Sequence, residues 1–380
     1  MSFIPVSEPL MAPNALRYVT ECLTSGWISS EGPFVQRFEE AFARQVGRLH
    51  GVAVCNGSAA LDVAVAALGI GPGDEVIMPS LTIISCAAAV VRAGATPVVV
   101  DSHADSWTMK IEEIERNITP RTKAIMPVHV YGLPVDMDPL LELASRHRLR
   151  VIEDAAEAHG LMYGDRHCGS FGDISTFSFY PNKFVTTGEG GMIMTDDPAL
   201  AARCRSLRNL CFQDGARFVH KELGWNMRMS SLPAALGLAQ LEELDRTVAR
   251  KRQIGEAYNR LLSGLRGVRL PLPQTARATN GYWAYGLVLG PEIPFDAAEA
   301  MRRLLALGIG TRPFFWPMHE QPVFLGTGRL RAAPCPNAEM LARRGFYIPN
   351  GLTMTDSQIT QVGDAVRMVV DSPERETGVL

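Results

Sequence analysis

The chain has 380 residues, more than one ordinary hydrophobic core holds, so two domains are expected. Hydrophobic residues make up 47% and charged residues 20% of the chain, a composition typical of a soluble globular protein. The net charge is −3 and lysine and arginine form no long block, so neither nucleic acid nor an anionic membrane is expected as a partner.

The sequence also indicates a compartment. No stretch reaches the roughly 18 apolar residues that a membrane helix needs, and the start, MSFIPVSEPLMAPN, is too rich in proline for a signal peptide. The seven cysteines are odd in number, scattered and never spaced as CxxC, which argues against a disulfide framework and against a zinc site. We therefore expect a cytoplasmic protein with reduced thiols.

The first half of the chain alternates between predicted helices and strands. An amphipathic helix is predicted at 34–46. Further helices are predicted from about 59 to 68, at 83–93, which is rich in alanine, and at 138–147. Runs rich in valine and isoleucine predict strands at 51–55, 75–80, 96–101, 123–132 and 150–154. Such strands, separated by helices, indicate an α/β fold with a mostly parallel sheet that is covered on both faces.

The pattern changes near residue 230. Residues 230–265 predict one or two long helices, and the proline-rich segment 270–281 opens a second region that ends in a helix near 356–370. We expect a large domain over residues 1–245, including an N-terminal helical segment, and a small α+β domain over residues 246–380.

Two residues carry most of the chemical information. Lys183 lies between two apolar strand-like runs, where burial disfavours a charged amine unless that amine is used. One use is a Schiff base to an aldehyde cofactor. Asp154 ends a predicted strand and could simply cap the following helix, but it could also keep the ring nitrogen of pyridoxal phosphate protonated. Together the two residues predict a pyridoxal-phosphate enzyme.

Other polar residues have weaker signals. Gly57 and Ser58 begin a predicted helix, whose N-terminus suits a phosphate or is simply capped, and Ser178 could reach the same phosphate. Glu157 follows Asp154 closely enough to share its pocket. His129 is interpreted as a core histidine with satisfied hydrogen bonds, and the GEGG run at 188–191 as a tight turn.

Four further candidates are basic or lie close to a basic residue. Asn226 and Arg228 precede a long predicted helix and indicate either a cap or an interface. Arg312 lies among aromatic residues close to His319, where it could stack structurally or bind a carboxylate or phosphate as a fork.

The combined motifs resemble the DegT/DnrJ/EryC1/StrS family of sugar-nucleotide aminotransferases. The matching segments cover most of the chain and include CNGSAALDVAV, GIGPGDEVIMPSLT, VIEDAAEAHG, GSFGDISTFSFYPNKFVTTGEGGMIMTDD and GWNMRMSSLPAALGLAQLE. The resemblance implies the type I fold of pyridoxal-phosphate enzymes, with a mostly parallel seven-stranded sheet.

The resemblance also implies roles for single residues. Lys183 falls on the Schiff-base lysine and Asp154 on the partner of the pyridine nitrogen. The phosphate-binding positions are Gly57, Ser58, Ser178 and, from the neighbouring subunit, Asn226. Glu157 falls near the phenolic oxygen of the cofactor. One departure is Ile83, which replaces the aromatic residue that stacks on the ring in the family.

We therefore expect a homodimer with shared active sites that moves an amino group from L-glutamate to a 4-keto-6-deoxy sugar nucleotide. Arg228, Arg312 and His319 are the candidates for binding the substrates' carboxylates and phosphates. Alternatives are amination of another keto sugar, at C3 or linked to UDP or dTDP, and a regulatory protein that binds pyridoxal phosphate without catalysis.

Overall fold

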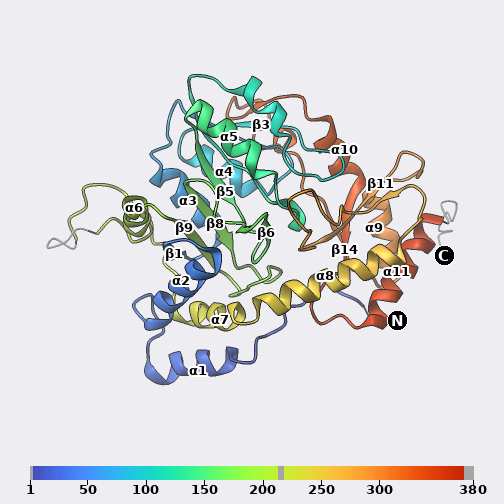
Figure 1. Cartoon of the computed structure of the whole chain (residues 1–380), viewed down its shortest axis with the longest axis horizontal. Coiled ribbons are helices and arrows are strands. Elements are labelled where there is room, and N and C mark those ends of the chain that lie inside the picture. The colour runs from blue at the N-terminus through green and yellow to red at the C-terminus, as the bar shows by residue number, and fades with distance from the viewer. Residues whose placement is uncertain (1–2, 213–217, 372–380) are drawn as a thin grey trace.

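The computed structural model describes residues 3–212 and 218–371 of the chain. An eight-stranded sheet with the strand order β1-β9-β8-β5-β4-β2-β3-β13 lies at its centre (Figure 1). The strands are β1 His50–Val54, β2 Glu75–Pro79, β3 Thr96–Val100, β4 Thr122–Ile125, β5 Arg150–Asp154, β8 Ile174–Ser178, β9 Gly191–Thr195 and β13 Arg331–Ala332. Only β9 runs against its neighbours, so the expected mostly parallel sheet is confirmed. Seven strands come from the first 195 residues, and β13 adds a two-residue eighth strand from the C-terminal part.

Alternate residues of each strand point to opposite faces of this sheet. In β2, Val76 and Met78 belong to the core that includes residues of the helices α3 and α4, whereas Ile77 packs in a second group with residues of α5. Both faces are therefore buried under helices, which explains why the strands read as continuous apolar runs. The helices of this region are α1 Ala15–Ser25, α2 Pro33–Val46, α3 Gly57–Ala67, α4 Ile84–Arg92, α5 Met137–His147, α6 Pro198–Arg208 and α7 Ser231–Leu241.

The long helix α8, Leu244–Leu261, leads from α7 to a second, four-stranded sheet (Figure 1). This antiparallel sheet has the order β10-β11-β14-β12. Its strands are β10 Val268–Arg269, β11 Tyr285–Leu289, β12 Arg312–Pro313 and β14 Gly345–Ile348. The helices α9 Ala297–Ala306, α10 Pro336–Arg344 and α11 Asp356–Asp371 accompany it, and buried residues of α8, α9 and α11 share its hydrophobic core.

The expected division of the chain at residue 245 stays a prediction, and two segments cross it. Ile4 from the start of the chain pairs with Ile309 and is buried in the core of the small sheet. In the other direction, Phe314 and Leu341 belong to the core of the large sheet. Each part therefore contributes residues to the hydrophobic core of the other.

One predicted strand is shorter than expected. The run 123–132 stays in the sheet only as β4, and a 3-10 turn, η3 Val130–Gly132, follows it. Pro127 has no N–H for the ladder, and Tyr131 adopts a left-handed φ of +57°, a conformation that no strand contains. The chain therefore turns away from the sheet here, and the backbone N–H of Tyr131 in this turn donates a hydrogen bond to Glu157.

The remaining short elements are β6 Met162–Tyr163 and β7 Arg166–His167, which pair with each other, and the 3-10 turns η1 Ile111–Glu113, η2 Glu115–Asn117 and η4 Met318–Glu320. Within the described residues, no helix combines the length and the apolar character that a membrane crossing requires.

Candidate active site

A cavity of about 490 Å³ opens at the carboxyl ends of β5 and β8, next to the N-terminus of α3. In an α/β sheet this is the edge at which ligands usually bind. Six predicted site residues line the cavity: Gly57, Ser58, Asp154, Glu157, Ser178 and Lys183. The fold thus brings together residues that are up to 126 positions apart in the sequence.

Lys183 lies in the loop between β8 and β9. Only 11% of its side chain is exposed, and its Nζ atom lies 3.2 Å from Oε1 of Glu157. The same nitrogen lies 4.0 Å from the ring centroid of Trp283, over the face of the indole. The amine is therefore held in one place by a carboxylate and an aromatic ring, and Lys183 lines the same cavity as Asp154.

Glu157 connects Lys183 to the turn that follows β4. Its Oε2 atom accepts a hydrogen bond of 2.8 Å from the backbone N–H of Tyr131. Burial raises the pKa of the Glu157 carboxyl, and the charge of Lys183 opposes that shift. Because both carboxylate oxygens have partners, Glu157 is fixed and in turn fixes the amine.

Asp154 is the last residue of β5 and is almost fully buried. Its Oδ1 atom accepts a hydrogen bond of 3.1 Å from the backbone N–H of Ala156, and its Oδ2 atom accepts one of 3.2 Å from the thiol of Cys86. Burial raises the pKa of this carboxyl. Among the described residues, no lysine, arginine or histidine forms an ion pair with it. A buried carboxylate without a cationic partner can bind a cationic N–H group of a ligand.

The other end of the cavity suits an anion. Asn56 caps α3, since its side chain accepts a hydrogen bond of 2.8 Å from the N–H of Ala59. The first amides of the helix, those of Gly57 and Ser58, therefore remain for a ligand. A Cβ atom on Gly57 would lie 2.7 Å from the Cβ atom of Ser178, so only glycine allows the helix to approach this strand so closely. The hydroxyl groups of Ser58 and Ser85, 2.7 Å apart, complete a polar cradle.

Four predicted residues do not line this cavity. Asn226 is exposed and pairs with Asn209, whose side chain accepts a hydrogen bond of 2.7 Å from Arg228. Arg312 is exposed on β12, opposite Tyr347 of β14.

The fourth residue, His319, has both ring nitrogens engaged. The hydroxyl of Ser80 lies 2.8 Å from Nδ1, and the carboxylate of Glu339 lies 3.1 Å from Nε2. His319 therefore links η4 to the end of β2 and to α10.

Other predictions concern single residues around the site. Ile83 lines the cavity, directly before α4, and 41% of it is exposed, so an aliphatic side chain does occupy this position at the wall. The interpretation of His129 as a satisfied core histidine is confirmed. Its Nδ1 atom accepts the N–H of Val135, and its Nε2 atom therefore carries the proton that it donates to Glu153 over 2.8 Å.

Sequence reasoning missed a second wall of the cavity. Trp283, Phe315 and Tyr347 come from the C-terminal part of the chain and also line the cavity. The aromatic run GYWAYG could have indicated this wall, because its tryptophan lies in a short segment directly before a strand. What that run cannot show is that the tryptophan contacts Lys183, 100 positions earlier.

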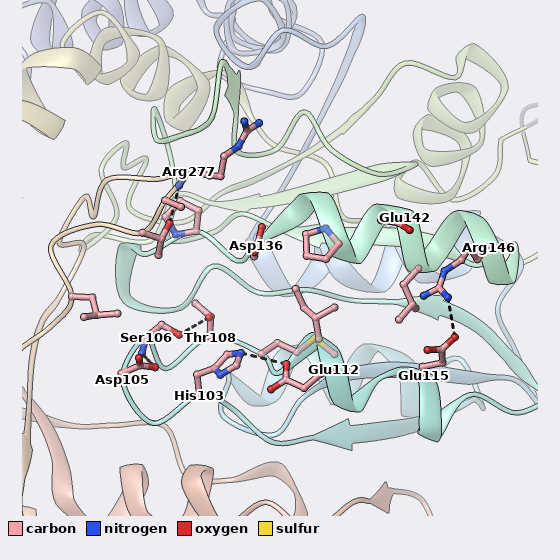
Figure 2. Close-up of a pocket in the computed structure, with 18 residues that line it drawn as sticks. His103, Asp105, Ser106, Thr108, Glu112, Glu115, Asp136, Glu142, Arg146 and Arg277 are labelled. Carbon is pink, nitrogen blue, oxygen red and sulfur yellow. Dashed lines mark hydrogen bonds and ion pairs between the residues drawn. The ribbon is translucent and has the colours of Figure 1, made fainter.

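A second cavity, of about 580 Å³, lies away from these residues (Figure 2). It is bordered by the loop after β3, by η1, by α5 and by residues 272–277. Its basic groups are paired with acids, as in the ion pairs of Arg146 with Glu115 at 3.3 Å and of His103 with Glu112 at 3.6 Å. None of the predicted site residues lines it, so its size alone does not make it the active site.

The comparisons with known proteins agree with the cavity at Lys183. The profile of the DegT/DnrJ/EryC1/StrS aminotransferase family matches residues 9–367. This chain belongs to that family. The expected family and the expected fold class are thereby confirmed, and the protein is an aminotransferase.

Individual relatives match nearly the whole chain. GDP-perosamine synthase of Caulobacter vibrioides is 44% identical over 370 residues, which cover 97% of this chain and 98% of that protein. GDP-perosamine synthase of Escherichia coli O157:H7 is 40% identical, with 96% and 98% covered. Among solved structures, DesV of S. venezuelae is 35% identical with a TM-score of 0.89, and covers 99% of this chain and 100% of its own. DesI, solved in the presence of its TDP-sugar product, is 33% identical with a TM-score of 0.90, with 97% and 93% covered.

Proposed function

We propose that this aminotransferase uses pyridoxal phosphate to move an amino group from L-glutamate to a 4-keto-6-deoxy sugar nucleotide, as a GDP-perosamine synthase. The observation that carries the proposal is that Lys183 and Asp154 line one cavity together with the N-terminus of α3. Relatives named GDP-perosamine synthase are 37% to 44% identical over almost the full chain, which supports this substrate class.

The residues of the cavity fit pyridoxal phosphate. The cofactor carries an aldehyde, a basic ring nitrogen and a phosphate, and the cavity offers a counterpart to each. Lys183 supplies the amine, Asp154 a buried carboxylate without a cationic partner among the described residues, and the amides of Gly57 and Ser58 a helix N-terminus. The hydroxyl group of Ser178 would add a phosphate contact. When bound, the cofactor supplies an electron sink for the carbon that loses its proton.

The chain's own residues would perform the remaining tasks. Lys183 would hold the cofactor covalently and, once released, carry a proton to and from the substrate carbon. Asp154 would keep the proton on the ring nitrogen through a charge-assisted hydrogen bond. Glu157 would orient the amine of Lys183 through the contact of 3.2 Å that it already makes.

Substrate recognition would fall to the aromatic wall and to the exposed rim. Trp283, Phe315 and Tyr347 supply flat surfaces for a sugar or a base, and Arg312 lies opposite Tyr347 in the small sheet. We propose that Arg312 and Arg228 bind carboxylates or phosphates. We give His319 a supporting role, because both of its ring nitrogens already have partners.

We further propose a homodimer in which Asn226 of one protomer reaches the phosphate end of the partner's cavity. Asn226 is exposed and lies outside the cavity of its own chain. Large apolar side chains are exposed on the same segment and near α1: Trp27, Ile28, Leu223 and Trp225. Such side chains are typical of a surface that a second copy covers. The scattered cysteines support a reducing, cytoplasmic compartment.

A substrate screen tests the proposal. The purified protein, loaded with pyridoxal phosphate, is given L-glutamate and one 4-keto-6-deoxy sugar nucleotide at a time, linked to GDP, UDP or dTDP, and the release of 2-oxoglutarate is measured. The proposal predicts turnover with the GDP sugar and at least tenfold lower kcat/KM with the others. Preference for the dTDP sugar would favour the alternative function, which DesI and the dTDP-amino-sugar transaminase of Streptomyces venezuelae, 40% identical, represent.

A further inference from the structure

Cys86 lies behind Asp154 and has no contact with solvent. It is the third residue of α4, it is completely buried, and its Sγ atom lies 3.2 Å from Oδ2 of Asp154. Cys86 is absent from the lining of the cavity, whereas Asp154 lines it. The thiol therefore acts on the carboxylate from the side that a bound ligand does not reach.

The direction of this hydrogen bond follows from the surroundings. Burial, and after it the negative charge of Asp154, raise the pKa of the Cys86 thiol well above its usual range, so the sulfur keeps its proton. That proton is donated to Asp154. The hydroxyl of Thr82 lies 3.5 Å from the same sulfur and donates to it, since the thiol proton is already used. Thr82 and Cys86 thus form a relay of two donors that ends on Asp154.

The hydrogen bond from Cys86 lowers the proton affinity of the Asp154 carboxylate. Burial raises the pKa of the Asp154 carboxyl, and the amide of Ala156 and the thiol of Cys86 are the two donors that bring it back down, helped by the positive charge of Lys183. A donor stabilises the anion more than the neutral acid. Removing the thiol would therefore make the Asp154 carboxylate a stronger base. A proton shared between Asp154 and a ligand nitrogen would then move toward the carboxylate oxygen.

We propose that Cys86 is a positioning residue that keeps Asp154 ionised, so that the proton shared with the cofactor's ring nitrogen stays on nitrogen. This inference rests on the proposed function, because it needs pyridoxal phosphate opposite Asp154. Cys86 touches neither substrate nor cofactor and acts only through the aspartate. A thiol is a weaker donor than a hydroxyl, so substitution at this position gives a graded series: alanine removes the donor, and serine strengthens it.

The test measures the ring nitrogen directly. The wild type, Cys86→Ala and Cys86→Ser are loaded with pyridoxal phosphate labelled with ¹⁵N in the ring, and the ¹⁵N chemical shift is recorded at pH 7.5. Cys86→Ala is expected to shift the signal toward unprotonated pyridine, and Cys86→Ser to leave it at or beyond the wild-type position. The kcat of Cys86→Ala should fall about fivefold, which corresponds to about 1 kcal/mol, the net size of one ordinary hydrogen bond, because a thiol is a weak donor, and that of Cys86→Ser should stay near wild type.

Two further variants separate this role from packing. Cys22 is equally buried and donates to the carbonyl of Ser231 over 3.6 Å, far from Asp154 in the fold, so Cys22→Ala should leave the ¹⁵N shift and kcat unchanged. Thr82→Val removes the first donor of the relay and should move the ¹⁵N shift in the same direction as Cys86→Ala, by less.

The outcomes also separate the two proposals. An unchanged ¹⁵N shift in Cys86→Ala, with cofactor bound, would overturn the role of Cys86, whatever happens to kcat. Failure of the wild type to bind pyridoxal phosphate at all would overturn the proposed function instead.

Discussion

At the scale of the residue, the site depends on how a few buried charges are balanced. Lys183 and Glu157 satisfy each other, whereas Asp154 is left with one amide and one thiol as donors. A buried carboxylate with such weak partners is costly unless a cation is supplied from outside the chain. This imbalance is the physical reason for assigning Asp154 to a ligand and Glu157 to the support of Lys183.

Asp154→Asn tests this assignment. The amide keeps the shape but cannot hold a proton on the ring nitrogen, so kcat should fall by about 100-fold or more, the range for a lost preorganised charge. Cofactor affinity should fall much less, because the contacts at α3 remain. The measurement is kcat together with the dissociation constant of the cofactor.

Asp101→Asn is the matched control for this variant. Asp101 is also buried and follows a strand of the same sheet, but its carboxylate pairs with Lys110 and caps α10. This control should lower the melting temperature and leave kcat near wild type. If Asp154→Asn instead loses affinity while kcat is kept, Asp154 is an anchor for the cofactor and has no electronic role.

At the scale of the element, the sequence predicted the bounds of those helices and strands whose ends are set by the local pattern of apolar and polar residues. The predicted strand 150–154 and the helix 138–147 agree with β5 and α5 to within one residue, because apolar runs and polar ends define them. The aromatic wall and Cys86 could not be predicted, since Trp283 and Cys86 reach Lys183 and Asp154 only through the packing of distant elements. Strand 123–132 was too long because a periodic pattern does not show where Tyr131 turns left-handed.

The helix α8 allows a prediction about pH. Lys251 of α8 is buried and donates to the backbone carbonyls of Trp283 and Asn350, and burial lowers its pKa to about 7. In the unfolded chain a lysine titrates near 10.4, so between about pH 7 and 10 the unfolded state binds more protons than the folded state. The contribution of Lys251 to stability should therefore rise with pH over this window, and below pH 7 its desolvation cost should be fully present.

Melting curves of the wild type and Lys251→Met from pH 6.5 to 9.5 check this expectation. The wild type should gain stability relative to the variant as the pH rises. Lys123→Met, at an exposed position, is the matched control and should show a pH dependence parallel to that of the wild type. Parallel curves for all three proteins would mean that Lys251 keeps its proton in the folded protein.

At the scale of the whole molecule, we propose that a second copy completes the cavity. Asn226 is exposed and Arg228 is half-buried, close in sequence to exposed apolar side chains, although the family pattern places Asn226 at a phosphate. An isologous dimer resolves this, because each chain can then lend its edge to the cavity of the other.

Mixing two inactive variants tests the shared site. Lys183→Ala lacks the amine, and Asn226→Asp places a carboxylate beside the phosphate. After unfolding and refolding together, a heterodimer has one cavity with neither defect, so about a quarter of all cavities should regain activity if the chains mix at random. Each variant refolded alone should stay inactive. If heterodimers form, shown by mass spectrometry, and no activity returns, the shared-site proposal is wrong.

Covalent attachment of the cofactor to Lys183 can be measured by reduction and peptide mapping. The protein is incubated with pyridoxal phosphate, reduced with borohydride, digested and analysed by mass spectrometry. We expect a single stoichiometric modification on Lys183, which should disappear in Lys183→Ala. A modification on Lys251, the other buried lysine bordering this region, or a scatter over exposed lysines with Lys183 unmodified, would contradict it.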